Sequence, residues 1–311
     1  MHFQRTLKNT VRCTGIGLHS GQKAYLSLQP APANHGIVFR RTDLNNARVP
    51  AHVMNVKDTR LCTTISNNDG VSVSTIEHLL AAFAGMGVDN AIVDIDGPEV
   101  PIMDGSAAPF VFLLECAGVV DQNAPKRWIR IKRKIGVKDG DKMAQFEPGP
   151  GFHLSFLLDF DHPVLKRQQV GISLTETAFI KEVSRARTFG FVKEVEYLQA
   201  NGLAKGASLD NAIAIGDYQI INEDGLRYED EFARHKVMDA LGDLYLLGTP
   251  IIGKFVGERS GHALNNLLLR ALLAQADAWE MVEGYPEGES AHIVDFAPIP
   301  GSLVLPATVT R

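Results

Sequence analysis

The residues with the clearest chemical potential stand on one predicted helix, over about 229–247. His235, Asp239 and Asp243 follow one another at intervals of four, which places them on one helix face. An apolar stripe on roughly the opposite side comprises Val237, Ala240, Leu241 and Leu244. The polar stripe is expected to face a cleft, where a metal ion would be a partner for such groups. An ion pair between His235 and Asp239 on a helix surface is the alternative.

A second group is the dipeptide Glu77-His78, on a helix predicted to begin at Ser74. Ser74 and Glu77 match the Ser-x-x-Glu capping box, so Glu77 has a structural interpretation as well as a catalytic one. His78 points away from the apolar stripe of its helix. The His-Glu-x-x-His and His-x-x-Glu-His patterns of metalloproteases are both absent, so a second ligand must come from another helix, such as the one that carries His235.

Two histidines and one aspartate would leave a tetrahedral metal with one position for water, as in catalytic zinc sites. Zinc lowers the pKa of bound water to about 7, and Glu77 is a candidate to accept the proton of the attacking water. Thiolate ligands are not expected. The three cysteines (Cys13, Cys62 and Cys116) form no Cys-x-x-Cys pattern and are odd in number.

His262, in the stretch Ser260-Gly-His-Ala-Leu-Asn-Asn266, stands at the predicted start of a helix over about 262–282. The positive end of a helix lowers the pKa of a histidine, so an acid role requires a negative partner, for which Asp243 is the candidate. A cationic histidine would protonate the leaving amine of an amide. A capping or surface role is the alternative for His262 taken alone.

Length and composition restrict the class of protein. A chain of 311 residues with 45% hydrophobic and 22% charged residues fits two globular domains. A net charge of −5 disfavours nucleic-acid binding, and the longest apolar stretches fall well short of the ~20 residues of a membrane span. The polar N-terminus lacks the apolar core of a secretory signal, so we expect a cytoplasmic protein without stable membrane insertion.

Strands and helices are predicted in mixed order, which favours α+β domains with two layers over a doubly wound parallel sheet. The polar, proline-containing segment Asp121-Gln-Asn-Ala-Pro125 is the predicted boundary. It divides the chain into an N-terminal domain over 1–124, which supplies Glu77 and His78, and a C-terminal domain over 125–311. No internal repeat is visible in the sequence.

Six motifs stand in order: Thr14-Gly-Ile-Gly-Leu-His-Ser-Gly21, Ser74-Thr-Ile-Glu-His78, Pro101-Ile-Met-Asp-Gly-Ser-Ala-Ala-Pro-Phe110, Ser184-Arg-Ala-Arg-Thr-Phe-Gly-Phe191, Arg234-His-Lys-x-x-Asp-x-x-Gly-Asp243 and Ser260-Gly-His-Ala-Leu-Asn-Asn266. Each motif is weak evidence alone. Together, over nearly the whole chain, they closely resemble the UDP-3-O-acyl-N-acetylglucosamine deacetylases, bacterial enzymes of the committed step of lipid A biosynthesis. The segment from Pro300 to Arg311 is the least similar part.

The resemblance implies a Zn²⁺ ion, or Fe²⁺ in the cell, whose ligands would be His78, His235 and Asp239. It implies that Glu77 is the general base and His262 the general acid. The fold that it implies is two α+β domains of similar topology, each a helix pair on a sheet, with the helix layers face to face and the active site between them.

Further roles follow from the same resemblance. Asp243 would orient His262 and stabilise its charge, and Thr188 would donate a hydrogen bond to the oxyanion. The expected substrate is UDP-3-O-(3-hydroxyacyl)-N-acetylglucosamine, and the unit over 190–223 corresponds to the family's acyl-chain insert. The implied substrate contacts are Phe191 along the acyl passage, Phe189 near the acetyl or sugar site, Lys236 and Arg259 at the diphosphate, Phe160 on uracil, and His19 and Cys62 near the sugar and the metal.

Other interpretations compete with this one. Core packing is an alternative for any phenylalanine, and simple solvation for any single lysine or arginine. A catalytically silent relative that binds a sugar nucleotide or a lipid would be expected to lack the base, the acid or a ligand. A peptidase is disfavoured by the absence of His-Glu-x-x-His. The tail after Pro300 is hypothesised to be a degradation tag that a protease recognises.

Overall fold

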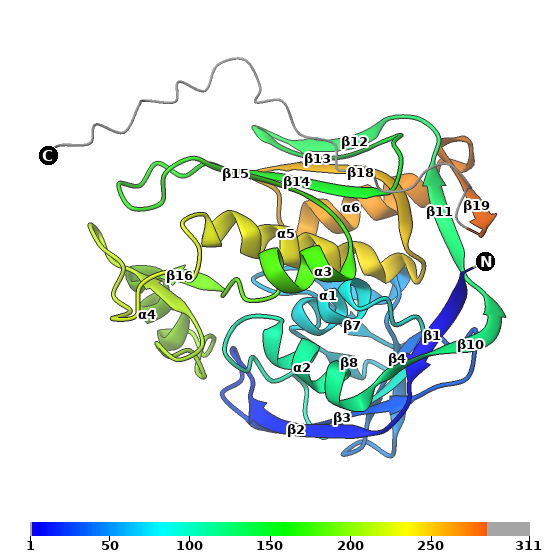
Figure 1. Ribbon diagram of the computed structural model, residues 1–311. Helices are drawn as coiled ribbons and strands as arrows, with labels where there is room; N and C mark the ends of the chain where they lie inside the picture. The colour runs from blue at the N-terminus through cyan, green and yellow to red at the C-terminus, as the bar shows by residue number, and fades with distance from the viewer. Residues whose placement is uncertain (1, 285–311) are drawn as a thin grey trace, which may run out of the picture.

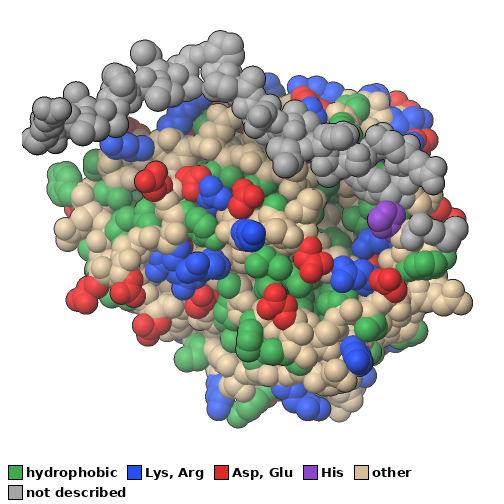
Figure 2. Space-filling view, viewed as in Figure 1, with side chains coloured by type: hydrophobic (Ala, Val, Ile, Leu, Met, Phe, Trp, Pro, Cys, Tyr) green, Lys and Arg blue, Asp and Glu red, His purple; other side chains and the backbone are tan. Residues whose placement is uncertain are grey.

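The computed structural model describes residues 2–284, which form an α+β fold with two main sheets (Figure 1). The sheets form the outer layers and the main helices lie between them, which confirms the predicted fold class. Acidic and basic side chains are interspersed on the face seen in Figure 2. Among residues 2–284, no helix is both long and apolar enough to cross a membrane. The predicted degradation tag after Pro300 lies outside the described residues.

The first sheet belongs to the N-terminal half of the chain. Its strands in spatial order are β2 (Val11–Ile16), β3 (Lys23–Pro30), β9 (Ala91–Ile95), β4 (Ile37–Arg41) and β5 (Ala47–Pro50). Neighbouring strands are antiparallel except for the parallel pair β4–β9. In β3, Ala24, Leu26 and Leu28 are buried in alternation with more exposed residues, the period of two that a sheet with one covered face requires.

The second sheet repeats this arrangement. The corresponding strands in spatial order are β12 (Ile135–Asp139), β13 (Lys142–Glu147), β18 (Ile251–Glu258), β14 (Phe152–Leu158) and β15 (Gln168–Ser173). Here too all neighbours are antiparallel except one parallel pair, β14–β18. In addition, β18 pairs with β11 (Arg127–Ile131), which pairs with β19 (Trp279–Glu283).

The helices follow the same duplication. In the first unit α1 (Glu77–Gly85) precedes the inner strand β9 and α2 (Ala108–Ala117) follows it. In the second unit α5 (Glu231–Leu244) precedes β18 and α6 (His262–Leu273) follows it. The similar topology that the resemblance implied is therefore present, although the sequence shows no repeat.

Each unit carries an insertion between its fourth sheet strand and its first main helix. In the first unit this is a small sheet of β6 (Val56–Asp58), β7 (Thr64–Ser66) and β8 (Ser72–Val73). In the second unit it contains α3 (Glu176–Ala178), the π-helix Phe179–Val183, β16 (Phe189–Phe191), α4 (Val192–Ala200) and β17 (Ile213–Ile215). The part with β16, α4 and β17 matches the predicted insert over 190–223 and projects beside the end of β2 (Figure 1).

One local prediction is wrong. The helix predicted to continue to residue 282 ends at Leu273, because residues 279–283 form β19 against β11, and this tertiary pairing overrides the local helix signal. The predicted boundary segment 121–125 is part of β10 (Val119–Pro125), which pairs with β1 (Phe3–Leu7). The division of the chain into 1–124 and 125–311 stays a prediction.

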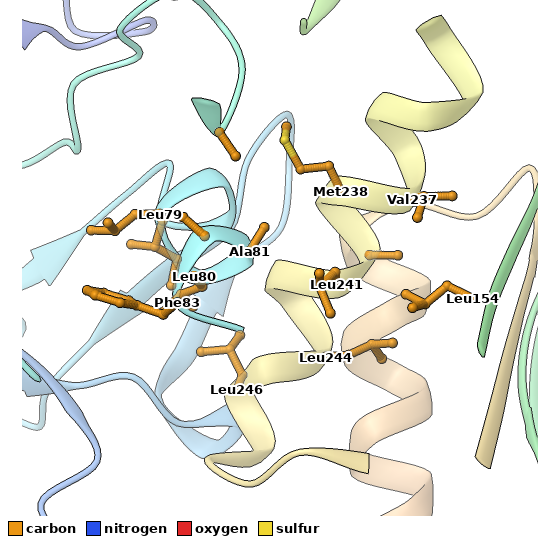
Figure 3. Close-up of a cluster of buried hydrophobic side chains, with 14 of the residues drawn as sticks. Leu79, Leu80, Ala81, Phe83, Leu154, Val237, Met238, Leu241, Leu244 and Leu246 are labelled. Carbon is orange, nitrogen blue, oxygen red and sulfur yellow. The ribbon is translucent and has the colours of Figure 1, made fainter. Parts of the chain in front are cut away.

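The contact between α1 and α5 joins the two units. Figure 3 shows Ala81 of α1 facing the helix that carries Met238 and Leu241, all of them buried. At Gly242 the backbones come closest, since a Cβ there would lie 2.0 Å from the carbonyl oxygen of Glu77. Only a glycine allows this approach, which sets the distance between the two helices that carry the candidate site.

We expect Gly242→Ala to destabilise the fold by about 1–3 kcal/mol, the usual cost of overpacking a close contact. The added methyl group must push α1 away from α5 because it meets backbone rather than a flexible side chain. Chemical denaturation measures the change. Gly97→Ala is the control, since its Cβ would meet only Ala24 at an ordinary 3.7 Å. Equal stability of the two variants would contradict the assignment of this contact.

Candidate active site

His78, His235 and Asp239 converge at the interface of α1 and α5. The Nε2 atoms of His78 and His235 lie 3.4 Å and 3.3 Å from the same carboxylate oxygen, Oδ1 of Asp239. One ligand atom from each residue lies within 4.8 Å of the others, and all three side chains are buried. The two imidazoles, which come from helices far apart in sequence, are therefore close enough to share one metal ion.

The chemistry of these donors fits a divalent cation. Oδ1 of Asp239 is buried without a hydrogen-bond partner among the described residues. Burial lowers the pKa of His235 to about 3, so its imidazole is neutral, which is the form that binds metals. Burial alone would raise the pKa of Asp239, but the ammonium of Lys236 beside it helps to hold this pKa well below its ordinary value. A buried anion beside the neutral imidazole of His235 is a suitable cation site.

A backbone carbonyl fixes the orientation of His235. Its Nδ1 lies 3.2 Å from the carbonyl oxygen of Ala186. Because a carbonyl only accepts hydrogen bonds, this nitrogen carries the proton, and the lone pair on Nε2 faces the other ligand atoms. Two residues further on, the Thr188 backbone is held on both sides, since its N–H donates to Gly105 and its carbonyl accepts from Ile213, each at 2.8 Å.

A histidine with two buried carboxylates lies beside the three candidate ligands. Nδ1 of His262 is 2.9 Å from Oδ2 of Asp243, and its Nε2 is 3.8 Å from Oε1 of Glu77. Burial disfavours the His262 cation, but the carboxylates of Asp243 and Glu77 outweigh this effect and raise the pKa of His262 to about 10. Asp243 thus provides the negative partner that an acidic histidine at the start of a helix requires.

The predicted capping box at Glu77 is wrong. The N-cap of α1 is Ile76, and no side chain caps this helix. Ser74 instead donates to the carbonyl oxygen of Pro98, while Oε2 of Glu77 accepts a 3.1 Å hydrogen bond from the backbone N–H of Thr63. Burial raises the pKa of the Glu77 carboxyl. With the capping role removed, a buried carboxylate beside the ligand group is left for chemistry.

Sequence reasoning missed two side chains that complete this group. Thr63 donates through Oγ1 to Oδ1 of Asp243 at 2.6 Å, and Asn265 donates through Nδ2 to Oδ2 of Asp243 at 2.9 Å. Asn265 follows His262 by three residues in the motif Ser260–Asn266, so both side chains lie on one helix face. This spacing could have predicted that Asn265 belongs to the same group. Thr63 stands in the first insertion, and nothing in the local sequence indicates its contact.

His19 and Cys62 line one cavity of about 400 Å³, together with residues of both insertions. The lining residues are His19, Asp58, Arg60, Leu61, Cys62, Thr64, Ser74 and Leu203. Both ring nitrogens of His19 are buried without a hydrogen-bond partner among the described residues. Burial raises the pKa of the Cys62 thiol to about 12, so Cys62 lines the cavity as a neutral thiol and not as a thiolate ligand.

Phe189 and Lys236 border the metal-ligand group. The ring of Phe189 lies 6.0 Å from that of His235, with the ammonium of Lys236 5.4 Å above its centre. The same ammonium donates to Oδ2 of Asp239 at 2.9 Å. Lys236 therefore already serves a ligand carboxylate, and its predicted contact with the diphosphate stays a prediction.

The other predicted substrate contacts lie at the insert and the second sheet. Phe160 and Phe191 pack against each other with ring centroids 5.9 Å apart, although the family resemblance implies that they contact different parts of the substrate. Arg259 forms ion pairs with Asp141 and, at 2.7 Å, with Asp159. Its charge is shared with two acids, so its predicted role at the diphosphate also stays a prediction.

Comparison with known proteins agrees with this geometry. Residues 4–274 match the family described as UDP-3-O-acyl N-acetylglycosamine deacetylase. The chain belongs to this deacetylase family. A UDP-3-O-acyl-N-acetylglucosamine deacetylase of Teredinibacter turnerae is 58% identical over 299 residues, covering 95% of this chain and 98% of that protein. A deacetylase of the same name from Acidithiobacillus ferrooxidans is 59% identical over 283 residues, covering 90% of this chain and 93% of that protein.

Membership of the deacetylase family confirms the predicted class, a hydrolytic enzyme that acts on an amide. It also removes the silent binding relative and the peptidase as interpretations, since the similarity extends over nearly the whole of each protein. A further deacetylase, from Shewanella oneidensis, is 52% identical over 307 residues, covering 98% of this chain and 99% of that protein. The family is one of metalloenzymes, which agrees with the His/Asp group described above.

The three candidate ligands lead to a prediction about metal binding. Adding zinc to chelator-treated protein should stabilise the fold, by about 2.7 kcal/mol when free zinc is at 100 times its Kd, because the ion binds only the folded state. In His78→Ala the stabilisation should be lost, since one of three buried ligands is missing. Thermal unfolding and elemental analysis measure both effects. His52→Ala, outside the ligand group, is the control, and retention of tight binding by His78→Ala would refute the ligand assignment.

Proposed function

We propose that this chain hydrolyses the N-acetyl group of UDP-3-O-(3-hydroxyacyl)-N-acetylglucosamine in the cytoplasm, as a step of lipid A biosynthesis, with zinc as its metal. The single observation that supports this most is the convergence of His78, His235 and Asp239 next to the buried pair of Glu77 and His262. The products would be acetate and the free 2-amine of the sugar. Fe²⁺ is an alternative ion in the cell because imidazole and carboxylate ligands suit both metals.

His78, His235 and Asp239 would hold the zinc ion. When bound, such an ion supplies Lewis-acid activation of water and of the amide carbonyl. The remaining tasks belong to the chain's own residues. Glu77 lies at the first turn of α1, adjacent to the ligand His78, and its buried carboxylate would accept the proton of the attacking water.

His262 would then donate a proton to the leaving nitrogen, because the amine must be protonated before it departs. Its Nδ1 is engaged by Asp243, so the proton to be donated is the one on Nε2, which is directed towards Glu77. Thr63 and Asn265 hold Asp243 in place and leave it no freedom to turn away. Thr188, which directly precedes Phe189, would donate to the oxyanion.

The substrate would extend in two directions from the acetyl group. Phe189, beside His235, would border the acetyl or sugar site, and the cavity lined by His19 and Cys62 would hold the sugar. The acyl chain would follow the insert over 190–223 past Phe191. The contacts of Phe160 with uracil and of Arg259 and Lys236 with the diphosphate stay predictions, since Phe160 packs against Phe191 on the proposed acyl side.

The two proposed domains, 1–124 and 125–311, would each supply part of the reaction. The first carries the base and one ligand, and the second carries the acid and two ligands. Neither unit holds a full set, so the reaction requires the packed interface of α1 and α5. The partner in this proposal is the acylated UDP-sugar alone, apart from a protease for the tail after Pro300.

Replacing the base tests the reaction scheme. Glu77→Ala should retain one zinc per chain but lose about 10²–10⁴ of kcat, the usual contribution of general base catalysis. Acetate release and elemental analysis on the same sample separate the two effects. His78→Ala is the comparison and should lose both the metal and the activity. Turnover by Glu77→Ala at the rate of the unchanged enzyme would remove Glu77 from the base role.

The pH dependence tests the acid. Because His262 must be protonated, activity should fall as pH rises through its pKa, which the nearby carboxylates raise. Asp243→Asn removes a charge that favours the cation, so the pKa of His262 should fall by about 1–3 units and the basic limb should move to lower pH. The profile of kcat/KM against pH measures this. A basic limb at the same pH in both proteins would reject His262 as the acid.

A further inference from the structure

Glu99 is a buried carboxylate that the proposed reaction scheme does not use. It is only 2% exposed and lies between β9 and α2. Its Oε1 accepts hydrogen bonds from the backbone N–H of His19 and from Oγ1 of Thr75, both at 2.9 Å, and its Oε2 accepts one from the backbone N–H of Ser20 at 2.8 Å. Three donors therefore converge on both oxygens, an arrangement that requires an acceptor-only side chain.

The turn over residues 17–20 rests directly on this carboxylate. A Cβ on Gly17 would lie 2.3 Å from Oε2 of Glu99, so the turn can approach only because residue 17 is glycine. Glu99 holds His19 by its backbone, while both ring nitrogens of His19 are buried without a partner among the described residues. The imidazole is thus kept available in the cavity, and its position is set by Glu99.

The Glu99 carboxylate also stabilises the segment that leads into α1. Thr75 has a φ of +55°, a conformation that β-branched residues rarely adopt. It stands two residues before Glu77, so a change in its backbone would move the first turn of α1. The hydrogen bond from Thr75 to Glu99 stabilises this conformation. One side chain therefore joins the His19 turn to the helix that carries the proposed base.

The insert docks on the opposite side of the turn. The backbone N–H of Lys205 donates to the carbonyl oxygen of His19 at 3.2 Å, and that of Gly206 donates to Leu18 at 3.0 Å. A Cβ on Gly206 would lie 2.2 Å from the carbonyl oxygen of Gly17. The insert, seen beside the end of β2 in Figure 1, is therefore in backbone contact with the turn that Glu99 holds.

We propose that Glu99 is a positioning residue that sets His19 and the docked insert relative to α1, and so determines how tightly the acylated substrate binds. Without its negative charge the turn would lose an acceptor, and His19 and the loop at Gly206 would shift together. The expected consequence is weaker substrate binding with little change in the chemical step. The part of this inference that concerns the acyl chain rests on the proposed function of the insert.

Glu99→Gln is the first test, because it keeps the shape and removes one acceptor oxygen. The amide NH₂ of the new side chain would face a backbone N–H. A buried donor left without an acceptor in this way weakens the equilibrium that holds the turn in place by about tenfold or more. We expect the KM for the long-chain acylated UDP-sugar to rise by about tenfold. The change in kcat should be much smaller, and the metal content should be unchanged.

Asp89→Asn is the matched control for loss of a largely buried carboxylate that anchors backbone. Asp89 accepts a hydrogen bond from the backbone N–H of Arg5 at 2.8 Å and pairs with Lys126 at 3.0 Å, so it too anchors backbone, but away from the turn. It should lose stability while its KM stays that of the unchanged enzyme. An equal rise in KM in both variants would mean that the effect is general destabilisation, and would overturn the proposal.

Gly206→Ala tests the same coupling from the insert and leaves every buried charge in place. Its methyl group would collide with the backbone of Gly17, whereas the methyl group of the control Gly216→Ala would meet first the flexible end of Ile221, at 3.0 Å. We expect Gly206→Ala to raise KM and Gly216→Ala to leave it unchanged. The double variant Glu99→Gln/Gly206→Ala should raise KM by less than the product of the single effects, since both release one turn.

Additive effects of the two substitutions, or an unchanged KM in Glu99→Gln, would overturn the inference. A substrate with a short acyl group separates this failure from a failure of the proposed function. If the insert binds the acyl chain, the unchanged enzyme has a lower KM for the long chain, and Glu99→Gln reduces that preference. If the unchanged enzyme has the same KM for both chain lengths, the proposed acyl passage is wrong. The comparison of the double variant with the two single variants still tests the positioning role of Glu99.

Discussion

The close packing of α1 against α5 is the contact on which the rest of the site depends. Gly242 lets the backbone of α5 approach Glu77 so closely that His78 on one helix reaches the carboxylate of Asp239 on the other. The site is therefore not built on either helix alone. Apolar side chains around the crossing, such as Ala81 and Leu241, bury the same interface and exclude water from it. The same interface joins the two units and forms the candidate site, so a change in the spacing of α1 and α5 affects both stability and chemistry.

Burial of so many polar groups at that interface requires that each has a partner. Asp243 accepts hydrogen bonds from Thr63, His262 and Asn265, which together satisfy a carboxylate that would otherwise be costly to bury. This network has a chemical consequence, since the nearby carboxylates keep the His262 imidazole cationic although it is enclosed. Among residues 2–284, Oδ1 of Asp239 has no hydrogen-bond partner, and a bound cation would compensate its charge.

The duplication explains why the site lies between two similar units but is not symmetric. Each unit places its first main helix, α1 or α5, at the interface. The five strands of the first sheet have the same order and the same parallel pairing as the five corresponding strands of the second sheet, which has β11 and β19 in addition. The insertions differ: one is a small sheet, and the other contains α3, a π-helix, α4 and two short strands. Both contribute to the cavity that contains His19, so the features expected to recognise the substrate are found where the units diverge.

The sequence by itself determined the chemical character of the site. Residues four apart on one helix identified His235, Asp239 and Asp243, and six motifs identified the family and the fold class. Only the tertiary structure decided that Glu77 is not a capping residue, that Thr63 holds it, that residues 279–283 form a strand, and that the two units are duplicates. The physical reason is that helix periodicity is a local property, readable from neighbouring letters, whereas Glu77 and Glu99 bind backbone N–H groups, which every residue except proline carries. Such donors cannot be recognised from residue types, and only the folded chain determines which backbone N–H group lies against a buried carboxylate.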